Sequence, residues 1–303
     1  MNLDTLIHAV SGTAAGALST IVTHPVDSIK TRLQAQDGTS ARRIGNMAYS
    51  STVQAFRVII QKEGVMALYQ GMAPALIGGA SAWGLYFGGY NYMKTVIPAD
   101  FAPRNFASAT AAGVFGTVVT CPIWLIKTRL QLYVREERQA ECFTLRSELR
   151  SILQEEGPRG LFKGIGPQLW LVLNPALQLT VYEKCKAWAH AFSGKDPGQK
   201  LDDAYLTACV IVSKTAATVI TTPLSVIKVR MQDPRNTAAS TDVKYRTIWQ
   251  SAQTIYSREG PRGFFRGAIP SLMRVMPGSL VTFLSYETIS HNLKKRLQNS
   301  RTS

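Results

Sequence analysis

The chain has 303 residues and a formal net charge of +15, and only 17% of its residues are charged, so long segments carry no ionisable side chain. Its four cysteines and four histidines lack the spacing of a metal site or a disulfide framework, and we expect no metal, no bound cofactor and no catalytic residues. A basic chain can bind nucleic acid, but the absence of any nucleic-acid motif argues against that partner.

Two motifs each occur three times, in the same order. The first is a proline followed by Lys-x-Arg-x-Gln, as in Pro25 to Gln34, and the second is Glu-Gly followed by aromatic-x-Gly, as in Glu63 to Gly71. Such regular recurrence indicates an internal repeat, here of about 100 residues. We therefore divide the chain into three repeats, at 1–100, 101–199 and 200–303.

Each repeat contains two segments with few or no charges, and each segment is long enough to cross a membrane as a helix. Gly, Ala, Ser and Thr are frequent in them, which suits helices packed around a wet interior. We predict an all-α membrane protein with six transmembrane helices; a soluble helical protein is the alternative. The segments are 5–26, 64–93, 105–126, 164–182, 204–227 with Lys214, and 267–286 with Arg274.

Most of the surplus positive charge falls in the long loops within the repeats, which places these loops on the inner side of a membrane. In the first loop, Val53, Phe56, Ile59 and Ile60 recur at helical spacing and predict a short surface helix. Two spans per repeat give all three repeats one orientation, related by an axis along the membrane normal. A proline near the inner end of each odd span should kink it, so that the three odd spans converge there.

At these motifs the whole chain resembles the mitochondrial carrier family of solute transporters. The resemblance implies a threefold pseudosymmetric bundle that alternates between outward- and inward-open states. In that family the acid two residues after each proline pairs with the lysine of the next repeat and closes a matrix-side gate. Here Trp124 and Ser225 replace two of the acids, so we expect one ion pair. The matrix gate comprises Asp27, which pairs with Lys127, together with Lys30, Lys228 and the glutamine braces Gln34, Gln131 and Gln232.

The opposite, cytosolic gate resembles the aromatic–acid–x–x–base pattern of the family. Asn91 and Ser290 depart from that pattern, so only Glu287 with Lys94 should form a full ion pair there. Both gates are therefore expected to be ionically weak. The charged residues of this gate are Lys94, Glu183, Lys186 and Glu287.

Gly71, Gly164 and Gly267 close the second motif and would begin the even helices, where free N–H groups bind phosphate. The resemblance implies that cardiolipin, as a structural lipid, binds at these glycines. Glycines used only for a tight turn are the alternative.

The substrate site is expected around Arg274 and Lys214, because a cation inside a membrane span is costly to retain without a role. Surplus cations in a wet cavity favour a polyanion. Aromatic and amide side chains suggest a planar ring, since aromatic faces stack on bases and amides bond their edges; the alternative is that the aromatic side chains face lipid. These side chains are Trp83, Tyr86, Asn174 and Gln178.

Subfamily resemblance also indicates a nucleotide-like solute. With Trp124 in the place of the acid, the second proline motif resembles that of carriers of folate and FAD, NAD, pyrimidine nucleotides and peroxisomal adenine nucleotides. The stretch from Trp83 to Phe87 resembles the folate/FAD branch. The stretch from Asn174 to Gln178, with Lys214, resembles the peroxisomal nucleotide/CoA branch. We expect a monomeric transporter of such a solute in the mitochondrial inner membrane, contacting membrane lipids, with a peroxisomal location as the alternative. Other functions left open are a carboxylate or amino-acid carrier and a non-transporting or proton-leak protein.

Overall fold

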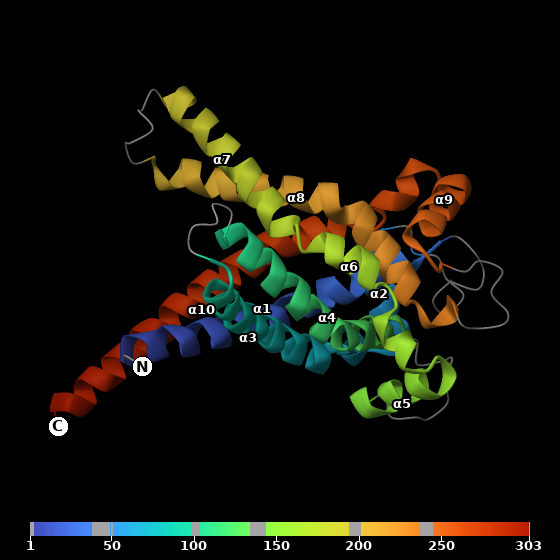
Figure 1. The fold of residues 1–303 in the computed structure, drawn as a ribbon, viewed down its shortest axis with the longest axis horizontal. Helices are drawn as coiled ribbons and strands as arrows, with labels where there is room; N and C mark the ends of the chain where they lie inside the picture. Colours follow the sequence, from blue (N-terminus) through green and yellow to red (C-terminus); the bar gives the residue numbers. More distant parts are fainter. Residues whose placement is uncertain are drawn as a thin grey trace.

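The computed structural model describes residues 3–37, 49, 51–98, 104–133, 144–193, 201–236 and 245–302 (Figure 1). These residues form helices and connecting turns, with no strand among them. The odd helix of each repeat is unbroken, and a short helix followed by a 3-10 turn leads from it to the even segment, with an additional 3-10 turn, η4, in the third repeat. The elements are α1 (Leu3–Ala35), α2 (Thr52–Glu63), η2 (Val65–Tyr69) and α3 (Met72–Val96); α4 (Arg104–Leu132), α5 (Leu145–Glu155), η3 (Pro158–Phe162), α6 (Ile165–Leu171) and α7 (Asn174–Ser193); and α8 (Asp203–Gln232), η4 (Pro234–Asn236), α9 (Ile248–Glu259), η5 (Pro261–Phe265) and α10 (Ala268–Thr302).

Figure 1 shows both ends of the chain at one end of the bundle, with α5 and α9 at the other. This is the arrangement that two long segments per repeat require. Three stretches of the described helices combine the length and apolar composition of a membrane span, namely Ala107–Leu132, Ala204–Gln232 and Pro261–Asn292. The predicted all-α architecture is confirmed, because the described residues form helices, and three of the six predicted spans meet this measure of length and composition.

The predicted fourth span, 164–182, is not one continuous helix. It is divided into α6 and α7 at Val172 and Leu173, whose N–H groups donate to carbonyls only three residues back. Pro175 explains the break, because proline has no N–H to continue the ladder and its ring clashes with the preceding turn. Asn174 therefore begins a new helix rather than continuing the old one.

The odd helices converge at the end that carries α2, α5 and α9, which we call the closed end. Ala35, Leu132 and Val229, one from each odd helix, form a single buried cluster there. Pro25, Pro122 and Pro223 each lie inside their helix, about two to three turns before its C-terminus. The odd helices thus meet at their C-terminal ends, as the position of the prolines predicts.

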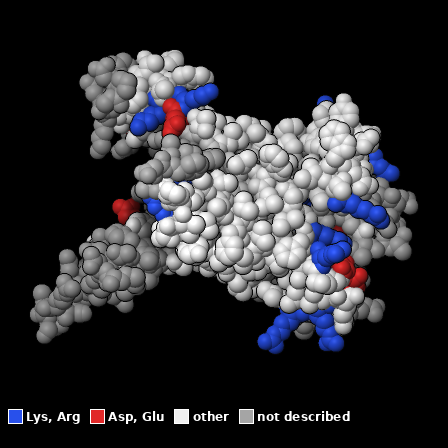
Figure 2. All heavy atoms as spheres, viewed as in Figure 1, with Lys and Arg blue, Asp and Glu red and all other residues white. Residues whose placement is uncertain are grey.

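The short helices cover the closed end with one apolar face each. Ile59 of α2, Ile152 of α5 and Ile255 of α9 are fully buried against the odd helix of their own repeat. The predicted surface helix around 53–60 lies within α2, and its other face leaves Val53 and Phe56 exposed. On the face drawn in Figure 2, Lys and Arg gather toward the two ends of the molecule, and a broad uncharged band lies between them.

Candidate functional site

One ion pair joins the first two repeats at the closed end. Lys127 of α4 donates to the carboxylate of Asp27 on α1, and both side chains are largely buried. These are the two residues for which the sequence predicted an ionic contact. Because the bond links two odd helices near their point of convergence, it must break before that end can open.

Gln131 braces this pair. Its amide nitrogen donates to Oδ2 of Asp27 at 3.3 Å, and its amide oxygen accepts from the hydroxyl of Thr31 at 2.8 Å. The side chain is thus bonded at both ends to α1. The joint between repeats one and two is consequently both ionic and fully hydrogen-bonded.

The two other joints lack the acid, and their glutamines show the consequence. Nε2 of Gln34 and Oε1 of Gln232 are buried and have no hydrogen-bond partner among the residues that the structure describes. Ser225 replaces an ion pair with a single bond to Gln34, at 3.3 Å. Trp124 instead packs its ring against α3, 3.5 Å from the place where a Cβ on Gly78 would lie.

Lys30 and Lys228 are the lysines that face those two acid-free joints. Among the described residues neither forms an ion pair, whereas Lys127 does. In the described part of the chain, neither lysine therefore has a carboxylate of its own at ion-pair distance. This agrees with the excess of positive charge that the motif pattern predicted there.

Sequence reasoning missed a ring of buried arginines that holds the closed end together. Nε of Arg32 donates to the carbonyl of Gln131 at 2.9 Å, so repeat one holds the odd helix of repeat two. In the same way, Nε of Arg129 donates to the carbonyl of Gln232 in the third repeat at 3.2 Å, and Nε of Arg230 donates to the carbonyl of Gln34 in the first repeat at 3.1 Å. Each arginine also pairs with the glutamate of its own Glu-Gly motif. The pairs are Arg32 with Glu63, Arg129 with Glu156 and Arg230 with Glu259.

The signal for this ring was present in the sequence, because each arginine stands at one fixed place in the first motif and each glutamate opens the second. A carbonyl at a helix C-terminus has no partner within its own helix, and a charged side chain can satisfy it. The ring therefore closes three helix ends at once, each with a residue from the preceding repeat.

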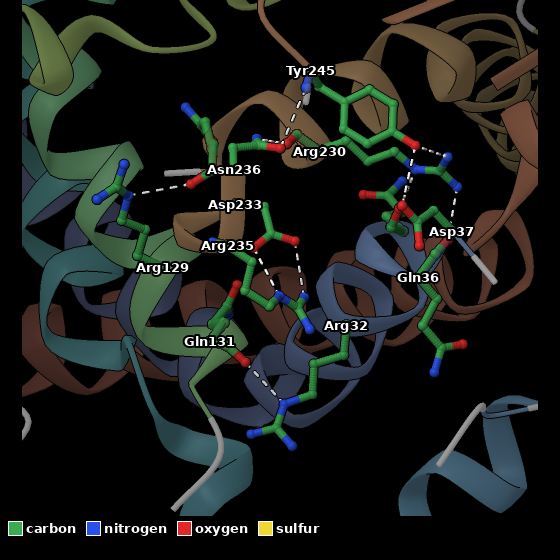
Figure 3. Close-up of polar contacts among 12 residues, drawn as sticks. Arg32, Gln36, Asp37, Arg129, Gln131, Arg230, Asp233, Arg235, Asn236 and Tyr245 are labelled. Atoms are coloured by element: carbon green, nitrogen blue, oxygen red, sulfur yellow. Dashed lines mark hydrogen bonds and ion pairs between the residues drawn. The ribbon is translucent and has the colours of Figure 1, made fainter. Parts of the chain in front are cut away.

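At the joint between repeats three and one, further bonds surround Arg230 (Figure 3). Arg230 donates to the carbonyl of Gln36 at 2.7 Å and to the hydroxyl of Tyr245 at 3.2 Å. That hydroxyl donates in turn to Asp37 at 3.4 Å. Arg266 reaches the same carbonyl of Gln36 at 3.2 Å. The bond from Arg230 to Gln36 has a counterpart in the bond of 3.1 Å from Arg32 to the carbonyl of Tyr133, whereas Tyr245 and Arg266 reinforce the joint between repeats three and one.

Above the closed end lies a cavity of about 570 Å³ between α1, α8 and α10. Both cations predicted to bind substrate line it. Lys214 of α8 donates to Oγ of Ser279 at 3.1 Å, and Nη1 of Arg274 lies 3.5 Å from Oδ1 of Asp27. Asp27 is therefore shared between the gate lysine and the cavity arginine. The positive charge of Arg274 is thus partly balanced, although its isolated position in the span predicted a surplus cation.

The other four predicted substrate residues do not line this cavity. The amide nitrogen of Asn174 donates to the hydroxyl of Thr221 at 2.8 Å, so it joins α7 to α8. Gln178 is half-buried on α7. Trp83 and Tyr86 belong to an aromatic cluster on α3, in which Trp83 is 65% exposed.

That cluster is ordered in two rows. Trp83 stacks on Phe87 with ring centres 5.7 Å apart, and Tyr86 stacks on Tyr90 at 6.2 Å. The ammonium group of Lys94 lies 4.6 Å from the centre of the Tyr90 ring. A lysine on the same helical row favours a wet surrounding for the tyrosines, because a charge is costly against lipid.

The predicted ion pair between Glu287 and Lys94 is not formed in this structure. Within the described residues no ion pair joins any of Lys94, Glu183, Lys186 and Glu287, and all but Lys94 are exposed. Figure 1 shows α7, which carries Glu183 and Lys186, diverging from α10 at this end of the bundle together with the start of α8. The structure is therefore closed at one end and spread at the other.

The three glycines predicted to bind lipid precede α3, α6 and α10 in a left-handed conformation, with φ of 78°, 77° and 75°. A Cβ on Gly71 would lie 2.9 Å from the carbonyl oxygen of Lys127, and one on Gly164 would lie 2.9 Å from Cγ of Gln232. A Cβ on Gly267 would lie 2.8 Å from Cγ of Gln34. These glycines thus permit close contact with the odd helix of the next repeat, which accounts for them without a lipid.

No three His, Cys, Asp or Glu side chains gather as metal ligands would in the described part of the chain.

The cavity also has walls that sequence reasoning did not assign. Phe283 and Tyr286 of α10 line it together with Ser279. The sequence signal was for Tyr286 alone, because 278, 282 and 286 follow Arg274 at intervals of four residues and so lie along the same side of the helix.

Comparison with known proteins agrees with this architecture. The family described as mitochondrial carrier protein matches residues 2–101, 98–192 and 204–297. Folate transporter 1, chloroplastic, of Arabidopsis thaliana is 34% identical over 95% of this chain and 96% of its own length. Mitochondrial nicotinamide adenine dinucleotide transporter 1 of Saccharomyces cerevisiae is 30% identical over 99% of this chain and 79% of its own. Nicotinamide adenine dinucleotide transporter 1, chloroplastic, of Arabidopsis thaliana is 28% identical over 99% and 96%.

Proposed function

From the premise that this chain belongs to the mitochondrial carrier family, we propose that it transports a nucleotide-like or folate-like anion across a membrane by alternating access. The observation that carries the proposal is the cavity that contains Arg274 and Lys214. Both are single cations in spans that are otherwise uncharged. Relatives named as folate and nicotinamide dinucleotide transporters match nearly the whole chain, which supports an aromatic anion as the solute.

Charge and polarity explain why such a solute suits the cavity. A phosphate or carboxylate is bound by charge-assisted hydrogen bonds, which are about twice as strong as neutral ones. The hydroxyl groups of Ser19, Thr20 and Thr23 line the same space. Each donates its one hydrogen to a backbone carbonyl, so a hydroxyl that binds an anion must first give up that bond. A basic amino acid would meet like charges there and is disfavoured.

The link between Arg274 and Asp27 provides a route from binding to gating. A substrate anion that engages Arg274 competes with Asp27 for the guanidinium group. Asp27 then loses one of its two cationic partners, which weakens the contact between α1 and α10 at the closed end. Binding of an anion would thereby favour opening of the gate that Asp27 and Lys127 close.

Uptake by reconstituted liposomes tests the proposal. Liposomes that contain the purified protein should accumulate labelled folate, ADP or NAD, while empty liposomes should not. Thermal unfolding in the presence of the same ligands gives a second measure, since a ligand that binds only the folded state stabilises it by mass action. Uptake confined to basic amino acids would contradict the proposal.

We further propose that the protein acts as a monomer in the mitochondrial inner membrane, with the peroxisomal membrane as the alternative, and that cardiolipin binds near Gly71, Gly164 and Gly267. In support of a lipid, a second cavity of about 570 Å³ beside Gly164 is lined by Arg159, Lys163 and Arg246. Cardiolipin should raise the unfolding temperature of the purified protein more than a zwitterionic lipid does. Fractionation of cells that express a tagged chain tests the location.

A further inference from the structure

The α10 wall of the cavity presents its polar and aromatic groups in a fixed order. Arg274 lies nearest the closed end, Ser279 follows, and Phe283 and Tyr286 lie nearest the open end. At 1.5 Å per residue, Ser279 stands about 7 Å above Arg274, and the two aromatic residues stand about 6 and 10 Å above Ser279. The part of α10 that lines the cavity thus carries a charge near the closed end and aromatic rings nearer the open end.

Lys214 adds a second charge at the middle level. Its ammonium group is fixed there by the bond of 3.1 Å to Ser279 Oγ, which itself donates to the carbonyl of Val275. The cavity therefore offers two cationic positions in succession, followed by two aromatic residues. Phe283 is 63% exposed, so its ring is accessible from the cavity.

The floor of the cavity blocks any extension past Arg274. Below the guanidinium group lies Asp27, which is bonded to Lys127 and Gln131. Along the axis of α10, a ligand whose anionic groups occupy the two cationic positions therefore extends toward Phe283 and Tyr286 rather than toward the closed end.

We propose that the cavity selects solutes whose anionic groups are terminal and whose aromatic ring lies at the opposite end, with Phe283 and Tyr286 as the residues that hold the ring. This inference rests on the proposed function and narrows its substrate class. ADP has a terminal pyrophosphate, and folate has two terminal carboxylates, so both fit this order. NAD and FAD place their pyrophosphate between two nucleosides, and one nucleoside would have to pass Arg274.

ADP and NAD make a matched pair for the first test, because NAD is ADP with a further nucleoside on its terminal phosphate. Dissociation constants from thermal shift and uptake competition should be at least tenfold lower for ADP and for folate than for NAD. Equal affinity for NAD, or uptake of NAD alone, would overturn the order of groups while leaving the proposed function intact. Absence of binding and uptake for all three would overturn both.

Phe283→Ala provides the second test, with inorganic pyrophosphate as a ring-free probe. The variant should weaken binding of ADP and folate about tenfold, because stacking on an aromatic side chain is lost. Pyrophosphate should bind the variant as it binds the wild-type protein. Phe115→Ala is the matched control, since Phe115 is 54% exposed on α4 and does not line the cavity.

Unchanged binding of ADP and folate to Phe283→Ala would overturn the role of this ring. Equal weakening for pyrophosphate and ADP would also do so, because it would show a general disturbance of the cavity. Thermal unfolding without ligand separates these outcomes from misfolding, since Phe283 is exposed and its truncation should leave the unfolding temperature within about a degree of the Phe115→Ala control.

Discussion

Nη1 of Arg274 lies 3.5 Å from Oδ1 of Asp27, so the deepest residue of the cavity touches the carboxylate that closes the bundle. Asp27 also accepts from Lys127 and Gln131. One carboxylate therefore connects three repeats, through α1, α4 and α10. The predictions below follow from this connection and from the unequal strength of the three joints.

Arg274→Ala should reduce uptake by more than tenfold, because a hydrogen bond between charged groups contributes roughly 1.5–3 kcal/mol to affinity. Arg274→Lys should also be impaired if the anion is held by two guanidinium N–H groups, whose planar geometry an ammonium cannot reproduce. Liposome uptake and ligand-induced thermal shift are the measurements. Arg57→Ala, an exposed arginine of α2, is the control. Wild-type affinity in Arg274→Ala would place the binding site elsewhere.

Asp27→Asn should lower the unfolding temperature, because it leaves Lys127 buried without a counter-charge, and breaking a buried ion pair costs about 3–5 kcal/mol. The exchange of both residues, Asp27→Lys with Lys127→Asp, should recover only part of the stability, since the new lysine would then face Arg274. Thermal unfolding of the two single variants and the double variant measures the coupling. Additive effects of the two single substitutions would show that the pair is not coupled.

Ser225→Asp should strengthen an acid-free joint. The carboxylate would be placed to pair with Lys30, as Asp27 pairs with Lys127, and we expect a gain of about 1–3 kcal/mol in the closed state. Uptake should become slower, because the closed end then opens less readily. Ser225→Asn is the matched control, since it has the same shape without the charge. If both variants unfold at the same temperature, no new ion pair has formed.

Gly267→Ala should destabilise the protein. Its φ of 75° costs a residue with a Cβ about 1–2 kcal/mol, and that Cβ would lie 2.8 Å from Cγ of Gln34. Gly16→Ala is the control, because no atom lies within 4 Å of its Cβ position and alanine favours a helix interior by up to about 1 kcal/mol. Thermal unfolding should therefore shift in opposite directions for the two substitutions. A higher unfolding temperature for Gly267→Ala than for the wild-type protein would contradict the close contact between Gly267 and Gln34.

Tyr245→Phe should loosen the reinforced joint between repeats three and one. The variant removes the hydroxyl that links Arg230 to Asp37, and a buried hydrogen bond contributes about 1 kcal/mol. We expect a lower unfolding temperature, measured without ligand. Tyr256→Phe is the control, because Tyr256 is 66% exposed on α9. Equal behaviour of the two variants would show that the extra bonds contribute nothing.

The sequence by itself determined the architecture, because its signals act within short segments. Charge-free runs of sufficient length indicated the spans, and the recurrent motifs gave three repeats with one orientation. The pair of Asp27 with Lys127 was predicted from the resemblance to the carrier family, which implies a pair between each acid and the lysine of the next repeat, and only one of these acids is present. The break before Asn174 is a partial exception, since Pro175 was visible but its effect depends on the local hydrogen bonds.

Only the tertiary structure decided which groups from different helices meet. The bonds from Arg32, Arg129 and Arg230 to carbonyls of the next repeat depend on the convergence of three helix ends. The distance between Arg274 and Asp27 depends on how α10 packs against α1. A charge pattern states which residues could pair, but the crossing of helices sets the distance between them, and electrostatic and hydrogen-bond energies depend on that distance.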